Sequence, residues 1–338
     1  MGATSVRDVA LRAGVSVGTV SNVLNRPSKV TADTVARVHA AIDELGFIRN
    51  DAARQLRAGH SKTIGLVVLD VRNPFFTDVA RGAEDKAADA GLTVILGNSD
   101  ENTDRESAYL DLFEEQRVHG VLISPFGDIT ARLERLRQRG IPAVLVDRSS
   151  GDTSFSSVSV DDLAGGRLAV EHLIAQGRTR IAFIGGPMQI LQVQDRLAGA
   201  RLAVDAHEGV TLEVVVVEAL SVLAGRAAGI EIAERAPHDR PDAVFAANDL
   251  VAMGVLQALM MRGADVRVPA DISLIGYDDI DFASAAVVPL SSIRQPSALI
   301  GQTAVEILLE QAADATTPPR QVVFEPELVV RDSSRGLR

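Results

Sequence analysis

Side chains that can form several hydrogen bonds gather directly behind the apolar runs in the later, larger part of the sequence. Carboxylates can accept hydrogen bonds from hydroxyl groups, guanidinium groups can donate in pairs, and amides can do both. Two adjacent phenylalanines add flat apolar surface, so the set suits the binding of a small polar molecule. The segments are "DVRNPFF" (70–76), "SPFGD" (124–128), "DR" (147–148), "GGP" (185–187), "AND" (247–249), "YDDID" (277–281) and "IRQP" (293–296).

These residues are not accompanied by the other groups that catalysis requires. No nucleophile with a base, no phosphate-binding loop and no metal cluster accompanies the carboxylates and arginines. The chain has no cysteine, and its six histidines, at 39, 60, 119, 172, 207 and 238, show no close ligand spacing. We therefore expect a binding protein, without enzyme activity, metal or cofactor.

The apolar runs indicate which elements position the polar residues. Continuous Val, Ile and Leu runs that alternate with amphipathic helical stretches are typical of parallel sheets covered on both faces. Ligands of such doubly wound folds bind outside the carboxyl ends of the strands, so two similar subdomains would meet at one cleft. The runs lie at 63–69, 92–97, 120–124 and 142–147, and again at 180–186, 213–217, 242–248 and 272–278.

Length and charge indicate a further, smaller domain. The 338 residues suffice for two or three domains, and the formal net charge is −11. Residues 1–62 hold nine lysine and arginine residues against five acidic ones, so they carry +4 and the rest carries −15. A basic head on an acidic body is expected when only one end meets phosphate groups. No signal peptide and no run of 18 apolar residues is visible, which favours a cytoplasmic protein without a membrane segment.

The sequence of the basic head predicts short helices with recognisable capping residues at their ends. Ser5 and Asp8 predict a capping box for a helix that runs to about residue 13, and Gly14 ends it. Ser16 then caps the helix of "GVSVGTVSNVLN" (14–25), in which Val20 and Leu24 are expected to be core. A third helix is expected from Thr31, as its cap, to Gly46. Together these elements predict a helix-turn-helix unit.

The segment "NDAARQLRAG" (50–59) follows, with Asn as a possible cap and Gly as a terminator. At this length an isolated helix is below the roughly 12 to 15 residues at which helices become marginally stable in water. From the residues alone, a plain linker and a helix that folds only against a partner are equally good interpretations.

Seven segments in order make the chain similar to the LacI/GalR family of bacterial transcriptional regulators. The resemblance implies a small all-α helix-turn-helix DNA-binding head (1–48), a hinge helix and linker (49–62), and a periplasmic-binding-protein-like α/β core (63–338) of two doubly wound parallel-sheet subdomains. It places residues 63–160 and 294–320 in the first subdomain and 161–290 and 321–332 in the second. It also implies a homodimer on double-stranded operator DNA, with a small-molecule effector. The segments are "VRDVALRAGVSVGTVSNVLN", "ARVHAAIDELGFIRNDAARQLR", "NPFF", "VDR", "FAANDLVAMG", "DISLIGYDD" and "IRQP".

By this resemblance, the base-contacting positions are Val17, Gly18 and Asn22, where family members often carry bulkier or basic residues. Val17 can contact a thymine methyl group, and Asn22 can form two hydrogen bonds with adenine, although it could also be a plain solvated residue. In the hinge the resemblance places Ala53 and Leu56 at the minor groove, with Leu56 as a wedge that kinks a central CG step. Further DNA contacts are expected from Ser5, Ser16, Thr19, Ser21, Asn25, Arg26, Lys29, Asn50 and Arg54.

The residues expected in the effector cleft resemble those of the periplasmic ribose receptor, so a monosaccharide such as ribose is the leading effector. Two alternatives are a purine-type co-repressor and a protein partner acting on a regulator with a vestigial cleft. Some of these residues also have plainer interpretations: Asn248 as a helix cap, Asp147 with Arg148 as a surface ion pair, and one phenylalanine as core. The set is Asn73, Phe75, Phe76, Ser124, Asp147, Arg148, Arg196, Asn248, Asp278 and Gln295, with weaker support for Phe126, Asp128 and Leu220.

Overall fold

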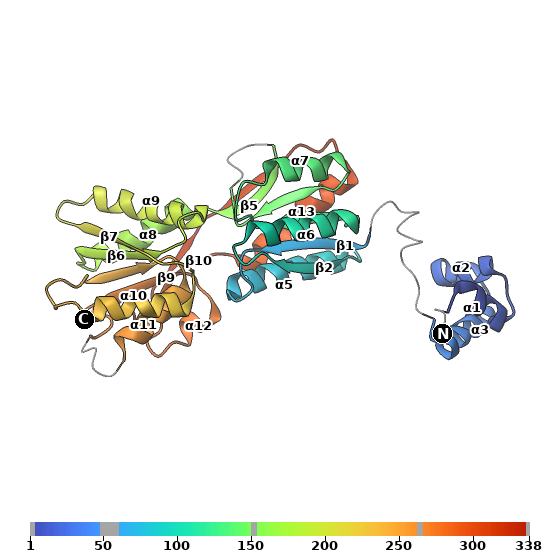
Figure 1. Ribbon diagram of the computed structural model, residues 1–338, viewed down its shortest axis with the longest axis horizontal. Helices are drawn as coiled ribbons and strands as arrows, with labels where there is room; N and C mark the ends of the chain where they lie inside the picture. The colour runs from blue at the N-terminus through green and yellow to red at the C-terminus, as the bar shows by residue number, and fades with distance from the viewer. Residues whose placement is uncertain (1–3, 48–60, 150–153, 262–265, 336–338) are drawn as a thin grey trace. The chain divides into compact units, whose positions relative to one another are not determined.

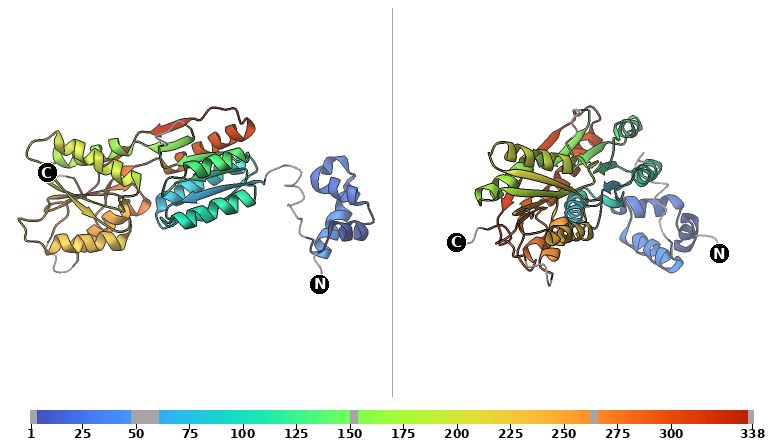
Figure 2. Two further views of the ribbon diagram at one scale, coloured as in Figure 1. Left: turned by 45° about the horizontal axis from the view of Figure 1, so that its top comes forward. Right: turned by 60° about the vertical axis from the view of Figure 1, so that its left-hand side comes forward.

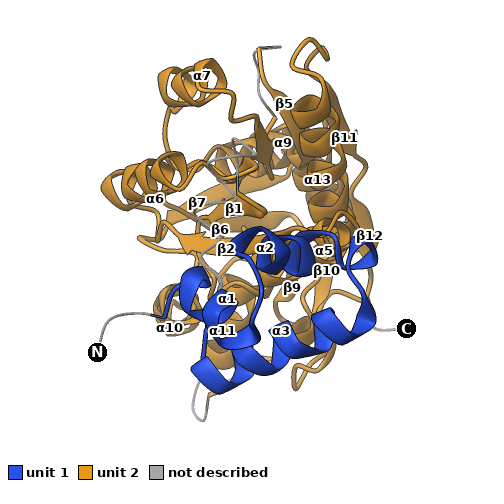
Figure 3. Cartoon of the chain, turned by 90° about the vertical axis from the view of Figure 1, so that its right-hand side faces the viewer, with its two compact units in different colours: residues 1–60 blue, residues 61–338 orange. Residues whose placement is uncertain are grey.

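The computed structural model describes residues 4–47, 61–149, 154–261 and 266–335, and the chain divides into two compact units, residues 1–60 and 61–338 (Figure 3). No helix in the described ranges has the length and apolar character needed to cross a membrane. Each unit is considered by itself.

Within the described residues 4–47, the first unit contains α1 (Val6–Ala13), α2 (Val17–Asn25) and α3 (Ala32–Leu45), with a short 3-10 turn at Pro27–Lys29. The predicted capping box is present, because Asp8 N donates to Ser5 Oγ and Ser5 N donates to Asp8 Oδ2. The three helices are held together by a small apolar core of Val9, Ala10, Ala13, Val20, Val23, Val38 and Ala41.

Two details of the first unit differ from expectation. Thr31 stands at the N-cap position of α3, but its side chain makes no capping hydrogen bond and instead donates to Thr34 Oγ1. Leu24 packs against the apolar core but is only partly buried, whereas Val20 is fully buried. The core of this unit is therefore smaller than the periodicity suggests.

The second unit contains two six-stranded sheets (Figures 1 and 2). All strand pairs are parallel except β10 with β12, which is antiparallel. All eight apolar runs are found as strands. The first sheet has the order β11 (Gln321–Phe324), β5 (Ser156–Val160), β4 (Ala143–Val146), β3 (Gly120–Ile123), β1 (Thr63–Val68), β2 (Thr93–Asn98). The second has the order β12 (Glu327–Val329), β10 (Ser291–Arg294), β9 (Ser273–Asp278), β8 (Ala243–Ala246), β6 (Arg180–Gly185), β7 (Thr211–Val216).

Helices cover both faces of each sheet, because alternate side chains of a buried strand point to opposite faces. On β1, for example, Leu66 belongs to the core shared with α5 (Pro74–Asp89) and α13 (Ser297–Ala313), and Val67 to the core shared with α6 (Thr103–Glu115) and α7 (Thr130–Gln138). The second sheet is covered by α8 (Asp162–Ala175) and α9 (Leu191–Asp205) on one face and by α10 (Val222–Glu234) and α11 (Asp249–Leu259) on the other (Figure 1). A short helix, α12 (Asp281–Ser284), follows β9.

The expected subdomain boundaries need correction at the end of the chain. Residues 321–332 were expected in the second subdomain, but β11 (321–324) pairs with β5 at the edge of the first sheet, so the last crossing falls between residues 324 and 327. In turn β10 (291–294) belongs to the second sheet, which therefore extends beyond residue 290. Strand β11 reads Gln-Val-Val-Phe, and it is too short and too exposed for its sequence to show to which sheet it belongs.

Glycines allow the helices on the sheets to approach one another closely. A Cβ atom on Gly166 of α8 would overlap the carbonyl oxygen of Arg196 on α9, and one on Gly199 of α9 would overlap that of Leu163 on α8. The same reciprocal arrangement joins α5 to α13 through Gly82 and Gly301. Backbone contact at this distance fixes the two helices of each pair against each other.

Candidate functional site

The exposed face of α2 carries the residues expected to read DNA bases. Val17 is 42% exposed, and Gly18 and Asn22 are also exposed, whereas Val20 and Val23 on the same helix face the core. Thr19 N donates to Ser16 Oγ at 3.0 Å, so the helix begins where the sequence predicts. The exposed face of the helix thus presents the apolar side chain of Val17, the backbone at Gly18 and the side-chain amide of Asn22.

Some polar residues around this face already form hydrogen bonds with neighbouring residues of the same unit. Asn25 Nδ2 donates to Ser21 O at 2.8 Å, and the Ser5 hydroxyl donates to Asp8 Oδ2 at 2.7 Å. Arg26 and Lys29 are exposed after the end of α2. The hinge residues expected to contact DNA, Asn50, Ala53, Arg54 and Leu56, lie outside the described residues.

A cavity of about 460 Å³ lies where the carboxyl ends of the two sheets face each other. We call it the cleft. It is lined by residues from both subdomains, which is the arrangement expected for a ligand held between two doubly wound halves. Of the predicted residues, those in its lining are Asn73, Phe75, Phe76, Asp147, Arg196, Leu220, Asn248 and Asp278.

Asp278 links the two subdomains. It ends β9, is 6% exposed, and has a positive φ of 102°. Its Oδ2 accepts from Asn73 Nδ2 at 2.9 Å, across the cleft, and its Oδ1 accepts from Gln295 Nε2 at 2.8 Å. Burial raises the pKa of this carboxyl group, whereas the charge of Arg196 opposes that rise. Gln295 therefore supports the cleft from behind Asp278 and is not part of its lining.

Arg196 is a buried cation with its own counterion. Its Nε donates to Asp162 Oδ1 at 2.7 Å and its Nη1 to Ala247 O at 2.8 Å. The guanidinium carbon lies 3.7 Å from the ring centroid of Tyr277, in cation–π geometry. The side chains of Arg196 and Asp162 are 5% and 7% exposed. Asp162 was not among the predicted site residues, but its ion pair fixes the orientation of Arg196, which was.

Asp147 is the most isolated carboxylate of the cleft. It is 4% exposed and adopts a positive φ of 57°. Gln192 Nε2 donates to its Oδ2 at 3.0 Å, whereas its Oδ1 has no hydrogen-bond partner among the described residues. Burial, followed by the negative charge of Asp162, raises its pKa well above the ordinary value. Asp147 can therefore accept a hydrogen bond from a ligand.

Apolar and amide groups complete the cleft. The rings of Phe75 and Phe76 meet edge to face with centroids 5.0 Å apart, and both are nearly buried while lining the cleft. Asn73 and Asn248 each cap a helix, accepting from Phe75 N at 3.1 Å and from Val251 N at 2.9 Å. Asn248 thus caps α11 and also lines the cleft, and its Nδ2 donates to Leu220 O at 3.4 Å.

Several predicted residues are not brought into the cleft. Arg148 donates to Gly127 O at 2.8 Å and lines a separate cavity together with Asp128, so it forms no ion pair with Asp147. Adjacent side chains leave the backbone in different directions, and the left-handed backbone of Asp147 separates this pair. Ser124 is fully buried and lies outside the lining, as does Phe126, which packs against the core.

Sequence reasoning missed other lining residues. Glu101 lies three residues beyond β2, so the strand-end rule applied to the run at 92–97 would have found it. Burial and then the charge of Asp70 raise the pKa of Glu101 to about 7. Gln192 lies in the first turn of α9, where no pattern of residue types marks it. The missed set is Leu69, Asp70, Glu101, Ile190, Gln192 and Val193.

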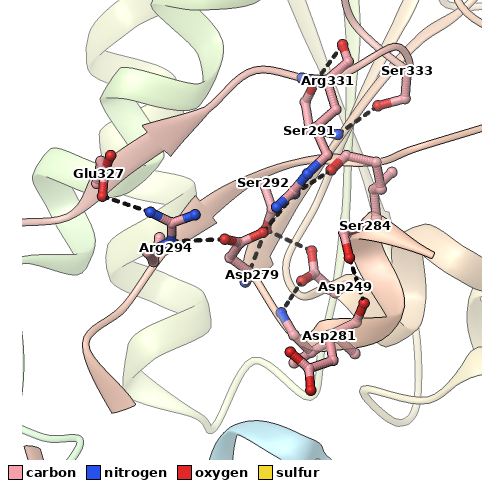
Figure 4. A network of polar contacts seen from close by, with 12 residues as sticks. Asp249, Asp279, Asp281, Ser284, Ser291, Ser292, Arg294, Glu327, Arg331 and Ser333 are labelled. Atoms are coloured by element: carbon pink, nitrogen blue, oxygen red, sulfur yellow. Dashed lines mark hydrogen bonds and ion pairs between the residues drawn. The ribbon is translucent and has the colours of Figure 1, made fainter. Parts of the chain in front are cut away.

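A second polar network begins at Asp279, the residue after Asp278 (Figure 4). Asp279 accepts from Arg294 Nε at 2.8 Å and from Arg331 Nη1 at 2.6 Å. Arg294 ends β10 and also donates to Glu327 Oε2 at 3.0 Å, at the start of β12. Two of the three segments that connect the subdomains therefore meet at one carboxylate next to the cleft.

Comparison with known proteins agrees with this architecture. Residues 5–50 match the model of bacterial regulatory proteins of the lacI family, and residues 170–334 match the periplasmic binding protein-like domain. The HTH-type transcriptional repressor PurR of Photobacterium profundum is 36% identical, covering 98% of this chain and 99% of the relative. The ribose operon repressor of Halalkalibacterium halodurans is 33% identical over 98% of both chains.

Solved structures give the same result. The Lac repressor dimer bound to operator and the anti-inducer ONPF is 29% identical, with a TM-score of 0.83, covering 98% of this chain and 99% of that one. A LacI family regulator from Enterococcus faecium with bound ribose is 29% identical, with a TM-score of 0.73, covering 82% and 100%. With its helix-turn-helix head and two-sheet core, the chain belongs to the LacI family of bacterial transcriptional regulators and is a DNA-binding regulator with a small-molecule cleft.

Proposed function

We propose that the effector of this regulator is a monosaccharide of the ribose type, bound in the cleft. The observation that carries the proposal is the convergence, from both subdomains, of Asn73, Asp147, Arg196, Asn248 and Asp278 beside two phenylalanine rings. Hydroxyl groups both donate and accept, so they match a mixed set of carboxylates, amides and a guanidinium group.

A purine is the second candidate, because relatives named PurR are among the most similar proteins. The cleft supports it less well. The aromatic residues in the described lining are Phe75 and Phe76, both from α5, and Leu220 stands on the other subdomain. A flat base would gain from aromatic surface on both faces, whereas a sugar needs it on one.

The test is calorimetric titration of the full chain with D-ribose, other pentoses, hexoses, hypoxanthine and guanine. We expect binding of a pentose and a change of at least fivefold in the affinity for operator DNA on its addition, which corresponds to a coupling of about 1 kcal/mol. Tight binding of a purine with no binding of any sugar would contradict the sugar assignment. Conversion of a bound sugar to a product would contradict our proposal that the protein binds without catalysis.

For the DNA, we propose that Asn22 reads an adenine, that Val17 contacts a thymine methyl group, and that Arg26 and Lys29 contact phosphates. Their exposure around α2 supports this assignment. The roles of Ala53 and Leu56 in the minor groove remain predictions. We further propose that the protein acts as a homodimer in the cytoplasm, in line with the dimeric Lac repressor structure to which it is similar.

We propose that ligand binding closes the subdomains through the Asn73–Asp278 contact and thereby changes the docking of the hinge on DNA. Support comes from the position of this contact, which already joins the two subdomains across the cleft. Replacement of Asp278 by alanine separates this mechanism from control by a protein partner. Loss of the response to a sugar is expected, and an unchanged response would contradict a role of the cleft.

A further inference from the structure

The lining of the cleft is acidic. Four carboxylates belong to it, Asp70, Glu101, Asp147 and Asp278, and the cation of the described lining is Arg196. The charge of Arg196 is already balanced, because Asp162 lies behind it with an N–O distance of 2.7 Å. When these carboxylates are ionised, the cleft lining therefore carries a net negative charge.

Arg196 is also badly placed to receive an anion. A guanidinium group binds a phosphate best through two parallel N–H donors. Here Nε, one donor of the side-on pair, is bonded to Asp162, and Nη1 is bonded to Ala247 O. A phosphate could use the side-on fork of Nε and Nη2 only by displacing the buried Asp162.

The other arginines near the cleft are engaged elsewhere. Arg72 pairs with Asp70 at 2.9 Å and with Asp100 at 2.9 Å, so its charge is offset at the rim. Arg148 donates to Gly127 O and lines a different cavity. Neither adds an unbalanced positive charge to the cleft lining.

One carboxylate oxygen in the cleft requires a donor. Oδ1 of Asp147 is buried without a hydrogen-bond partner among the described residues, and its own residue is 4% exposed. A ligand hydroxyl would satisfy it, because a hydroxyl group both donates and accepts, whereas a ligand phosphate or carboxylate would place a second negative charge beside the ionised form of Asp147.

We propose that the cleft accepts the neutral, unphosphorylated form of its sugar and rejects phosphate esters and carboxylates of that sugar. The inference rests on the proposed monosaccharide effector and adds the charge state of the ligand. It places the signal before the kinase reaction that would phosphorylate the sugar, so that the regulator responds to the substrate of that reaction and not to its product.

The test compares three probes by calorimetry on the full chain at pH 8.0: D-ribose, D-ribose 5-phosphate and 5-O-methyl-D-ribose. The methyl ether carries a neutral substituent at the same carbon as the phosphate, so it separates size from charge. We expect ribose to bind and the phosphate ester to bind at least about 100-fold more weakly, because like charges face each other at low dielectric. The methyl ether should bind much more tightly than the phosphate.

A variant at the cleft rim tests the source of the discrimination. Glu101→Gln removes one negative charge at nearly constant shape. The dissociation constant of ribose 5-phosphate, divided by that of ribose, should therefore fall by about tenfold. The matched control is Asp104→Asn, an exposed carboxylate in the first turn of α6 that lies outside the cleft lining, and it should leave the ratio unchanged.

The outcomes separate the two proposals. Binding of ribose 5-phosphate within tenfold of ribose overturns the inference and leaves the sugar assignment intact. Rejection of the methyl ether as strong as that of the phosphate also overturns it, because the size of the substituent or the furanose ring that both derivatives must adopt would then be the cause. If neither ribose nor any other neutral sugar binds, the proposed function itself fails, and the inference with it.

Discussion

Replacement of Asp162 by alanine should destabilise the core strongly. Asp162 and Arg196 form a buried pair, and removal of one partner of such a pair costs about 3 to 5 kcal/mol because the other charge stays buried. The lower end is expected here, since Asp278 Oδ1 lies 3.9 Å from Arg196 Nη1 and keeps part of the compensation. Affinity for the sugar should fall as well, because Nε of Arg196 loses the partner that orients it.

The assay is urea denaturation at pH 7.5, followed by circular dichroism, with equal m-values required for the comparison. Glu171→Ala is the matched control: it breaks an exposed pair with Arg167 on the same helix and should cost no more than about 0.5 kcal/mol. A second variant, Asp162→Ala with Arg196→Met, removes the uncompensated charge and should recover at least half of the loss.

A loss of less than about 1 kcal/mol for Asp162→Ala, or one equal to that of Glu171→Ala, would refute the reasoning, since a buried guanidinium group without its counterion could then be accommodated at little cost. Failure of the double variant to recover stability would point to packing, and not charge, as the cause.

Four further predictions follow from the same structure. Asn22→Ala should relax the preference at one base pair of each half-site by about 1 to 3 kcal/mol, as read from competition binding with an operator library. Glu101 keeps a proton in the native state up to a pKa of about 7, whereas the unfolded group loses it near 4.5, so stability should fall as pH rises through this window. Urea denaturation between pH 5 and 8 should show a flatter profile for Glu101→Gln. Gly166→Ala should force α8 and α9 apart at the carbonyl of Arg196, costing about 1 to 3 kcal/mol by thermal denaturation and weakening sugar binding, and unchanged ribose affinity would contradict this link. Asp279→Asn weakens the junction of the connecting segments, so the sugar should change operator affinity less than in the wild type, while its own dissociation constant moves less than about threefold.

The part of the fold that could be predicted from sequence is the part with buried strands. Continuous apolar runs identified the four strands β1 to β4 and the four strands β6 to β9. For the inner strands the reason is that strands covered on both faces must be apolar throughout, whereas β2 and β7 are partly exposed edge strands that are nevertheless rich in apolar residues. Strand β5 was missed although it is fully buried, because three of its five residues are serines. Edge strands β11 and β12 have only four and three residues and are partly exposed, so only pairing in three dimensions assigns them to a sheet.

The site was predictable where a residue directly follows a strand. Asn73, Asp147, Asn248 and Asp278 were found in this way, since the fold fixes where strand ends point. Asp147 lines the cleft and Arg148 lines another cavity, because sequence adjacency says nothing about which side chain turns toward the cleft. Asp162 could not have been found, because its contact with Arg196 depends on the close approach of two helices.

The glycine contact between α8 and α9 also bears on how this regulator could acquire a new signal. The contact with Gly166 fixes the backbone of Arg196, and a substitution of its side chain would leave the buried Asp162 without a counterion. Evolution toward another effector is therefore expected to leave this part of the cleft unchanged. Leu220 and Glu101 lie in loops at the edge of the cleft and are only partly buried, so they can vary without such a penalty. Divergence of specificity among paralogues should concentrate at these two positions.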